Sequence, residues 1–338
     1  MPSAWIDLLR GTIRLESKRL ELSGVLLDEQ DREVEIKRSI PLLDLDRLSV
    51  SENITISGPA IAALMRETIP LVIIANYGES LLGSIQPATP AHAQWRLRQY
   101  NLSQDTAFTL TMARRLVAAK IYNQRRALQR LAHTREAQLG NTIITLGNAI
   151  KQAENSTGLS HLLGTEGQAA ALWFQNWAQF LPHSFPFEKR SRRPPHNPVN
   201  AILSFTSSIL YHEMTSALHS CGLDPGLGVY HVTENGRWSL ALDLMEPYRP
   251  VIVEPLTIDL LSRGILCEKH FHPQEGGIYL TPLGRKRLIL QYEKRMEREF
   301  LSEHRGHRTT LRAQIQQDAA QFKAALERPD AYQPFRMN

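Results

Sequence analysis

The first 85 residues alternate between apolar and polar positions as half-buried β-strands do. The stretches GTIRLESKRLELSG (11–24) and VEIKRSIPLLDLDRLSVS (34–51) show this two-residue period, and the β-branched run IPLVIIANYG (69–78) is typical of a buried strand. One short helix is predicted at 59–68, where Pro59 suits a first helical turn. The pattern predicts a small, mainly β domain in this part of the chain.

Beyond the Pro-containing stretch SIQPATPAHAQ (84–94), apolar residues recur with the period of an α-helix. Phe108, Met112 and Leu116 are four positions apart, as residues on one helix face are. A further helix is predicted at 197–222, because it starts with Asn-Pro and ends with Gly. These patterns predict an α+β protein, a small N-terminal mainly β domain followed by a larger all-helical domain. The predicted divisions are 1–85 for the β domain, 86–93 for a linker, 94–305 for the helical domain and 306–338 for a C-terminal helix and tail.

The composition of the 338-residue chain is that of a soluble globular protein and excludes several other classes. Hydrophobic residues make up 42% and charged residues 22% of the chain, which is sufficient for a core. The two cysteines, Cys221 and Cys267, are too few for a disulfide framework. The N-terminus carries charges too early for a secretory signal, and no apolar stretch is long enough to span a bilayer. We therefore expect a cytoplasmic protein.

Positive charge is concentrated in two segments, although the net charge is only +5. Residues 94–135 contain nine Arg or Lys and one acid, and EKRSRRPP (188–195) adds four basic residues. A solvated helix face and a basic loop would account for these charges, but exposed surfaces usually mix both signs. The near absence of acids in the first segment therefore favours a nucleic-acid or phosphate-bearing partner.

The segment SLALDLMEPYRP (239–250) places Asp243 and Glu246 three positions apart among apolar residues. This spacing is compatible with a helix-capping box, with a salt bridge, or with a divalent metal that compensates two neighbouring negative charges. His231 lies twelve positions before Asp243, and an imidazole beside carboxylates favours Mn²⁺-like ions. Glu166 is a third candidate acid. It is expected at a helix start, where its alternative role is to stabilise the helix dipole.

Four segments between residues 160 and 255 carry a resemblance to a known family. In order they read GTEGQAAALWF, FPFEKRSRRPPHNPVNAILSF, CGLDPGLGVYH and SLALDLMEPYRP. Their order and spacing resemble the CRISPR-associated endonuclease/integrase of spacer acquisition, the CRISPR-associated protein one family. The resemblance implies that Glu166, His231 and Glu246 hold a divalent metal, Mn²⁺ or Mg²⁺, and that Asp243 is a supporting carboxylate in the catalytic site.

The resemblance also implies a reaction and a set of partners. A metal-dependent enzyme of this kind cleaves DNA and inserts new spacers into a CRISPR array, by attack of a 3′-hydroxyl on a phosphodiester. The β domain is then expected to form a homodimer that binds a small ferredoxin-like protein, CRISPR-associated protein two. The candidates for contacts with the DNA backbone are Arg114, Arg115, Lys120, Arg125, Arg126, Lys189, Arg190, Arg192 and Arg193.

Two other interpretations of the same residues are open at this point. A non-enzymatic helical protein that binds DNA or RNA would use the basic segments in the same way, and its acids would only cap helices. A zinc protein is the other interpretation, because CEKHFH places Cys267 close to His270 and His272. This spacing, however, fits no common zinc pattern.

Overall fold

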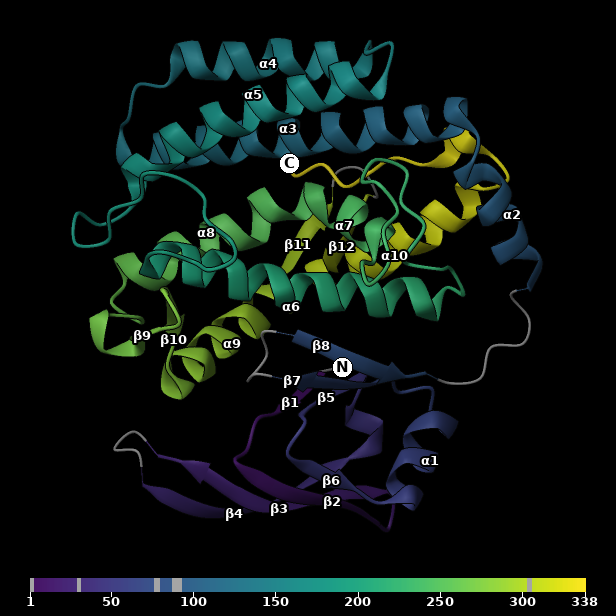
Figure 1. The fold of residues 1–338 in the computed structure, drawn as a ribbon, viewed down its shortest axis with the longest axis vertical. Coiled ribbons are helices and arrows are strands. Elements are labelled where there is room, and N and C mark those ends of the chain that lie inside the picture. Colours follow the sequence, from purple (N-terminus) through teal and green to yellow (C-terminus); the bar gives the residue numbers. More distant parts are fainter. Residues whose placement is uncertain (1–2, 29–31, 76–79, 87–92, 303–305) are drawn as a thin grey trace. The chain divides into compact units, whose positions relative to one another are not determined.

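The structure, a computed structural model, describes residues 3–28, 32–75, 80–86, 93–302 and 306–338. The chain forms two compact units (Figure 1). Residues 1–90 with 280–289 make up the first, called here the β unit, and residues 91–279 with 290–338 make up the second, the helical unit. Most of the predicted linker 86–93 lies outside the described residues.

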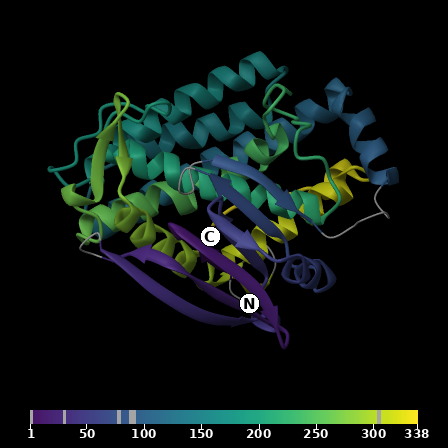
Figure 2. The same ribbon diagram turned by 60° about the horizontal axis from the view of Figure 1, so that its bottom comes forward.

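The β unit contains two four-stranded sheets, whose strands are purple to blue in Figure 2. One sheet has the order β1-β5-β7-β8 and is parallel except between β7 and β8. The other has the order β4-β3-β2-β6 and is antiparallel except between β2 and β6. The strands are β1 (Ser3–Ile6), β2 (Arg10–Glu16), β3 (Arg19–Leu27), β4 (Glu33–Pro41), β5 (Arg47–Ser51), β6 (Ile54–Ile56), β7 (Leu71–Ala75) and β8 (Ser80–Ile85).

Apolar side chains from both sheets and from one helix form the core of the β unit. The alternation seen at 11–24 places Ile13 and Leu20 in this core, both fully buried. The predicted helix is α1 (Gly58–Arg66), which begins after Ser57; the Ser57 hydroxyl accepts a hydrogen bond from a backbone amide of the first turn. The β-branched run predicted as a buried strand is β7. The strand and helix periods of the sequence therefore identify these elements correctly.

The longest helix of the helical unit is α3 (Thr106–Arg135). It packs against α4 (Gly140–Glu154), α5 (Leu159–Trp177) and α8 (Arg249–Ser262), and α3, α4 and α5 lie side by side in Figure 1. The other α-helices that follow β8 are α2 (Ala93–Ser103), α6 (Pro198–Ser220), α7 (Ser239–Met245), α9 (Pro282–Met296) and α10 (Leu311–Ala325). Every helix in the described part of the chain is too short or too polar to cross a lipid bilayer.

Two long helices follow the predicted periodicity and boundaries. In α3 the side chains of Met112 and Leu116 are at most 1% exposed, and Asp105 caps the helix by accepting hydrogen bonds from two backbone amides. Helix α6 begins after Asn197 as predicted, and Gly222 beyond its end has a φ of 76°. The predicted fold class, a strand-rich N-terminal part followed by a helical part, is confirmed.

The predicted helical domain (94–305) and the predicted C-terminal helix and tail (306–338) also contain two short two-stranded sheets. One is formed by β9 (Phe271–Gln274) and β10 (Gly277–Leu280), and the other by β11 (Glu299–Ser302) and β12 (His307–Thr310). Glu275 and Gly276, between β9 and β10, both have positive φ angles, 47° and 75°, as type I′ hairpin turns require. The sequences of these four short strands contain few β-branched residues. The apolar pattern of the sequence therefore predicted no strands here.

A buried arginine holds three carboxylates together at the junction of α6, α9 and α10. Arg312 donates hydrogen bonds to Glu213, Glu293 and Glu297, and its side chain is 10% exposed. Tyr292 donates a further bond to Glu213 at 2.8 Å. Burial alone would lower the pKa of Arg312, but the surrounding carboxylates, Glu213 first, raise it. The guanidinium therefore stays charged and links the three helices.

We expect Arg312→Met to lower the free energy of unfolding by about 3–5 kcal/mol, because Glu213 then keeps its negative charge in the interior without its guanidinium partner. Urea unfolding followed by circular dichroism measures the change. The matched control is Arg308→Met, which removes an exposed ion pair with Glu299 and should cost about 0–1 kcal/mol. Equal, small losses for both variants would show that the buried network does not stabilise the fold.

Candidate active site

Asp243 lies in the last turn of α7, where its side chain is fully buried. Its carboxylate accepts hydrogen bonds from the backbone amides of Val229, Tyr230 and His231, at 2.6, 3.0 and 2.9 Å. The N-cap of α7 is Trp238, so Asp243 does not begin a helix. The capping-box interpretation is therefore wrong, and Asp243 instead fixes the loop that precedes α7.

The same carboxylate orients the imidazole of His231. The Nδ1 atom of His231 lies 2.6 Å from Oδ1 of Asp243. An ionised carboxylate can only accept, so Nδ1 is the donor in this contact, and Nε2 is the ring nitrogen that remains for a ligand. Close packing requires Gly228 at the start of this loop, since a Cβ there would lie 2.5 Å from the carbonyl oxygen of His231 and 3.0 Å from Oδ2 of Asp243.

Glu246 follows directly in the 3₁₀ turn η5 (Glu246–Tyr248), and its side chain is 10% exposed. Arg249 donates a hydrogen bond to its Oε1 at 3.1 Å, and Lys120 forms an ion pair with its Oε2. Burial would raise the pKa of Glu246, but Lys120 and then Arg249 outweigh it, and the net effect lowers the pKa. Glu246 is therefore a stably ionised carboxylate in the interior.

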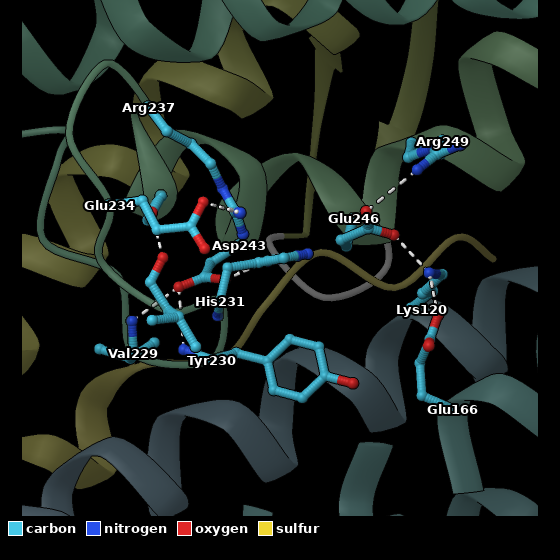
Figure 3. A network of polar contacts seen from close by, with 12 residues as sticks. Lys120, Glu166, Val229, Tyr230, His231, Glu234, Arg237, Asp243, Glu246 and Arg249 are labelled. Atoms are coloured by element: carbon cyan, nitrogen blue, oxygen red, sulfur yellow. Dashed lines mark hydrogen bonds and ion pairs between the residues drawn. The ribbon is translucent and has the colours of Figure 1, made fainter. Parts of the chain in front are cut away.

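Glu166 lies in the middle of α5 and not at a helix start, which corrects the prediction from the sequence. The charge of the helix dipole is confined to the first turn, so stabilising the dipole does not account for this residue. Its Oε1 pairs with the ammonium group of Lys120. Figure 3 shows Lys120 between Glu166 and Glu246, with one ion pair to each.

Lys120 was predicted to contact DNA, and the structure places it inside the site. Its side chain is only 12% exposed. Burial would lower the pKa of Lys120, but Glu246 and Glu166 outweigh it and raise the pKa. The sequence does indicate that Lys120 is buried, because position 120 continues the four-residue spacing of Phe108, Met112 and Leu116. A lysine on an apolar helix face indicates a buried acidic partner.

Glu166, His231 and Glu246 come from three different elements; in Figure 3 Glu166 and Glu246 meet at Lys120, and His231 lies beside Asp243 in the same part of the helical unit. His231 contributes to the lowered pKa of Glu246. Burial, followed by Glu166 and Glu246, raises the pKa of the neighbouring Tyr230 phenol. Within the described ranges, no three His, Cys, Asp or Glu side chains are close enough to hold a metal ion together. The donor set, two carboxylates and an imidazole with a free Nε2, nevertheless has the chemistry that Mn²⁺ or Mg²⁺ requires.

Comparison with known proteins identifies the family. The family model described as CRISPR associated protein Cas1 matches residues 11–294. The chain belongs to the Cas1 family. It is 33% identical over 326 residues to the CRISPR-associated endonuclease Cas1 1 of Thermus thermophilus, and the match covers 96% of each chain. It is 35% identical over 293 residues to a CRISPR-associated exonuclease Cas4/endonuclease Cas1 fusion of Rhodospirillum rubrum; this match covers 85% of the chain and 50% of the fusion, so the chain spans about half the length of that relative.

Two solved structures share the fold of this Cas1-family chain. A casposase bound to integration product has a TM-score of 0.84 at 20% identity, covering 100% of this chain and 96% of the casposase chain. The Cas6-RT-Cas1–Cas2 complex contains a chain with a TM-score of 0.77 at 26% identity, covering 100% of this chain and 36% of that chain. Both support the strand-rich N-terminal part followed by helices.

The basic residues predicted to contact DNA differ in their surroundings. Arg115 is engaged internally, donating to the carbonyl oxygen of Tyr332 at 3.0 Å and to Asp330 at 2.9 Å. Arg190 is also engaged, with Asn200 at 2.9 Å and Ser204 at 3.1 Å. The side chains of Arg114, Arg125 and Arg126 are half-buried on α3, and those of Lys189, Arg192 and Arg193 are exposed. The last three are therefore the best placed to contact a ligand.

Asn200 organises the exposed basic loop, a role that sequence analysis did not assign. It is 1% exposed in the first turn of α6. Its Oδ1 accepts from the Ser191 amide at 3.0 Å, and its Nδ2 donates to the carbonyl oxygen of Lys189 at 2.9 Å. The sequence signal is an Asn between Val199 and Ala201 on the apolar side of a helix, where a polar side chain needs a partner.

The structure gives no support to a zinc site. The Nδ1 atom of His270 accepts a hydrogen bond from the backbone amide of Cys267 at 3.0 Å, so this atom completes a local turn. Cys221 and Cys267 are both free cysteines. Over the ranges that the structure covers, no cluster of metal-binding side chains includes them.

We expect Glu246→Gln to lower the free energy of unfolding by about 3 kcal/mol at neutral pH, because it leaves Lys120 and Arg249 with one carboxylate fewer. The folded-state pKa of Glu246 is depressed, so its contribution is complete above the unfolded pKa of about 4.3 and is lost as the pH falls toward the folded value. The difference between wild type and variant should thus be constant from about pH 6 to 8 and shrink below about pH 4.3 in urea titrations. The control is Glu234→Gln in an exposed pair with Arg237, for which a small difference is expected at every pH. A Glu246→Gln difference that does not shrink in acid would contradict the assignment of Glu246 as the ionised partner.

Proposed function

We propose that this Cas1-family protein is a metal-dependent DNA endonuclease and integrase that inserts new spacers into a CRISPR array. The observation that carries the proposal is the pairing of Glu166 and Glu246 through Lys120. His231, held by the buried Asp243, is near enough to contribute to the lowered pKa of Glu246. The similarity to the endonuclease of Thermus thermophilus over nearly the whole chain supports it. The fold shared with a casposase that was captured with its integration product is consistent with strand transfer.

The site residues have distinct roles in this proposal. Glu166 and Glu246 offer carboxylate oxygens, and Asp243 keeps Nδ1 of His231 protonated so that Nε2 can bind a metal. A divalent metal, Mn²⁺ or Mg²⁺, would supply charge stabilisation for a phosphodiester under attack by a 3′-hydroxyl or by water. Lys120 and Arg249 add positive charge at the same place, which favours binding of an anionic phosphodiester.

We expect Glu166→Gln and His231→Ala to reduce strand transfer and cleavage at least 100-fold with Mn²⁺ or Mg²⁺, because each variant removes a proposed metal ligand. DNA binding should stay within about twofold of wild type, since the contacts with the DNA backbone are proposed for other side chains. A gel-based strand-transfer assay and a fluorescence-anisotropy titration measure the two quantities. Glu234→Gln, on the exposed loop after His231, is the control that should retain full activity.

The same assay decides between the enzyme and a binding protein without activity. That alternative required acids that cap helices, and Glu166 and Asp243 do not. A wild-type protein that binds DNA but forms no product at any Mn²⁺ concentration would overturn the proposed function. Normal strand transfer by His231→Ala would overturn the assignment of the site.

We also propose that the exposed residues of the 188–195 loop contact the DNA backbone. Replacing Lys189, Arg192 and Arg193 together by alanine should weaken binding of duplex DNA irrespective of its sequence. The slope of log K against log salt concentration should become less steep by about 1 for each phosphate that the protein no longer neutralises, up to about 3. Anisotropy titrations from 50 to 300 mM salt, roughly the range over which this dependence is measured, test it.

A matched control uses three exposed basic residues of the β unit. Arg14, Lys37 and Arg38 lie on β2 and β4, and replacing them by alanine removes the same net charge. Their replacement should leave the salt dependence unchanged. Equal weakening by both triple variants would mean that net charge alone, and not the loop, accounts for binding.

The proposed assembly has two further parts. The β unit is proposed to mediate a homodimer, and the dimer to bind a small ferredoxin-like partner of the CRISPR-associated protein two type. The second proposal is supported by the Cas6-RT-Cas1–Cas2 complex, whose chain has the same fold at 26% identity. The proposed location of this assembly is the prokaryotic cytoplasm, where CRISPR arrays are.

A further inference from the structure

Residues 329–338, called here the C-terminal strap, run along α3 (Figure 1). The strap begins with the 3₁₀ turn η7 (Pro329–Ala331) and continues without regular structure. Arg115 of α3 binds its first part through the carbonyl oxygen of Tyr332, and Arg130 binds its end by donating to the carbonyl oxygen of Asn338 at 2.8 Å. The strap is therefore fastened to both halves of the longest helix.

Asn123, between these two arginines on α3, joins the strap to the turn that carries Glu246. Its side chain is fully buried. Its Nδ2 donates to the carbonyl oxygen of Pro247 at 2.7 Å and to that of Phe335 at 2.9 Å, and its Oδ1 accepts from the amide of Met337 at 2.8 Å. A single amide group thus binds η5 on one side and the strap on the other.

A second contact connects the strap to the same turn. The rings of Phe335 and Tyr248 are stacked, with centroids 5.0 Å apart and planes inclined by 15°. Tyr248 is fully buried, and Phe335 is 4% exposed. The Phe335 amide is itself held by Asp318 of α10 at 3.2 Å. Both residues that follow Glu246, Pro247 and Tyr248, are therefore held by Asn123 and the strap.

The turn η5 joins α7 directly to α8, and backbone hydrogen bonds from Glu246 to Asp243 and from Arg249 to Glu246 continue the helical path through it. It is a single 3₁₀ turn without a side-chain cap, and Pro247 lacks a backbone N–H. Ligands of a metal or of a reacting group must be held within about 0.5 Å of the productive position. Asn123 and the strap add a support on the α3 side of the turn, the side from which Lys120 meets the Glu246 carboxylate.

We propose that Asn123 and Phe335 are positioning residues for Glu246, and that the C-terminal strap is a structural part of the active site. The predicted effect on catalysis rests on the proposed function. The predicted effect on the position of the Glu246 carboxylate does not. If the strap only covered apolar surface, removing its interactions with α3 and η5 would lower stability and leave Glu246 in place.

The test uses the full-length variants Asn123→Leu and Phe335→Leu. The first replacement keeps the branched shape of the side chain and removes the three hydrogen bonds, and the second removes the ring stack and leaves a smaller apolar side chain. The position of Glu246 is determined directly by crystallography of each variant. We expect the Glu246 carboxylate to move beyond the 4 Å range of an ion pair with Lys120, and an unchanged ion pair in both variants would overturn the proposal.

Metal binding and kinetics give a readout that stability alone would not change. Mn²⁺ affinity, measured by electron paramagnetic resonance of the free ion, should fall about 10- to 100-fold in either variant, as for other residues that support metal ligands. The kcat of strand transfer should fall with it. The KM for DNA should stay within about twofold, because neither variant changes contacts that bind DNA equally in the ground state and the transition state. Wild-type Mn²⁺ affinity and kcat in both variants would overturn the proposal.

A control variant separates positioning from general destabilisation. Phe185→Leu removes a different buried ring contact of the helical unit, with Phe271, and should destabilise the fold while leaving Mn²⁺ affinity unchanged. Failure of the proposed function has a different signature: wild type would then show no Mn²⁺ site that Glu246→Gln removes. In that case the crystallographic displacement of Glu246 still decides whether the strap positions it.

Discussion

Two carboxylates, the half-buried Glu166 and the buried Glu246, share one cation, the ammonium group of Lys120. Neither acid could be buried in ionised form at low cost without a partner, and a lone ammonium would be equally unfavourable there. The three groups come from α5, η5 and α3, so their mutual attraction also fixes the relative positions of these elements. The geometry of the site depends on this balance of charges more than on any single apolar contact.

Buried ion pairs are not the most effective way to stabilise a fold, because well-packed apolar side chains of similar volume often stabilise it as much. The presence of these pairs therefore favours a role in chemistry. The two carboxylates, held by Lys120 and on the side of Glu246 also by Arg249, are oxygen ligands of the kind that a divalent cation takes. The imidazole of His231, with Nδ1 fixed by Asp243, adds a neutral donor to the same region, which is the kind of site that perturbed pKa values tend to mark.

The sequence predicts the order of strands and helices because their periods differ, and the caps of α6 because Asn-Pro and Gly have local conformational causes. It also predicts Glu166, His231 and Asp243 with Glu246 as one group through four motifs in series. It does not predict the role of Lys120, whose partners lie 46 and 126 positions away. Periodicity identifies the buried face of a helix, but it does not identify the residues that pack against that face. Asn200 and Asn123 were missed for the same reason: each is a polar residue on an apolar face whose partners are backbone groups of distant segments.

The hydrogen bonds of Asn123 with Phe335 and Met337 have a consequence for biosynthesis. The ribosome synthesises Asn123 and Glu246 well before residues 335 and 337, and the residues added most recently to a nascent chain are enclosed in the exit tunnel. A nascent chain can therefore fold α3 and η5 while the groups that join them to the strap are still enclosed. The contacts around Glu246 are therefore completed later than α3 and η5 themselves, once residues 335 and 337 have left the tunnel.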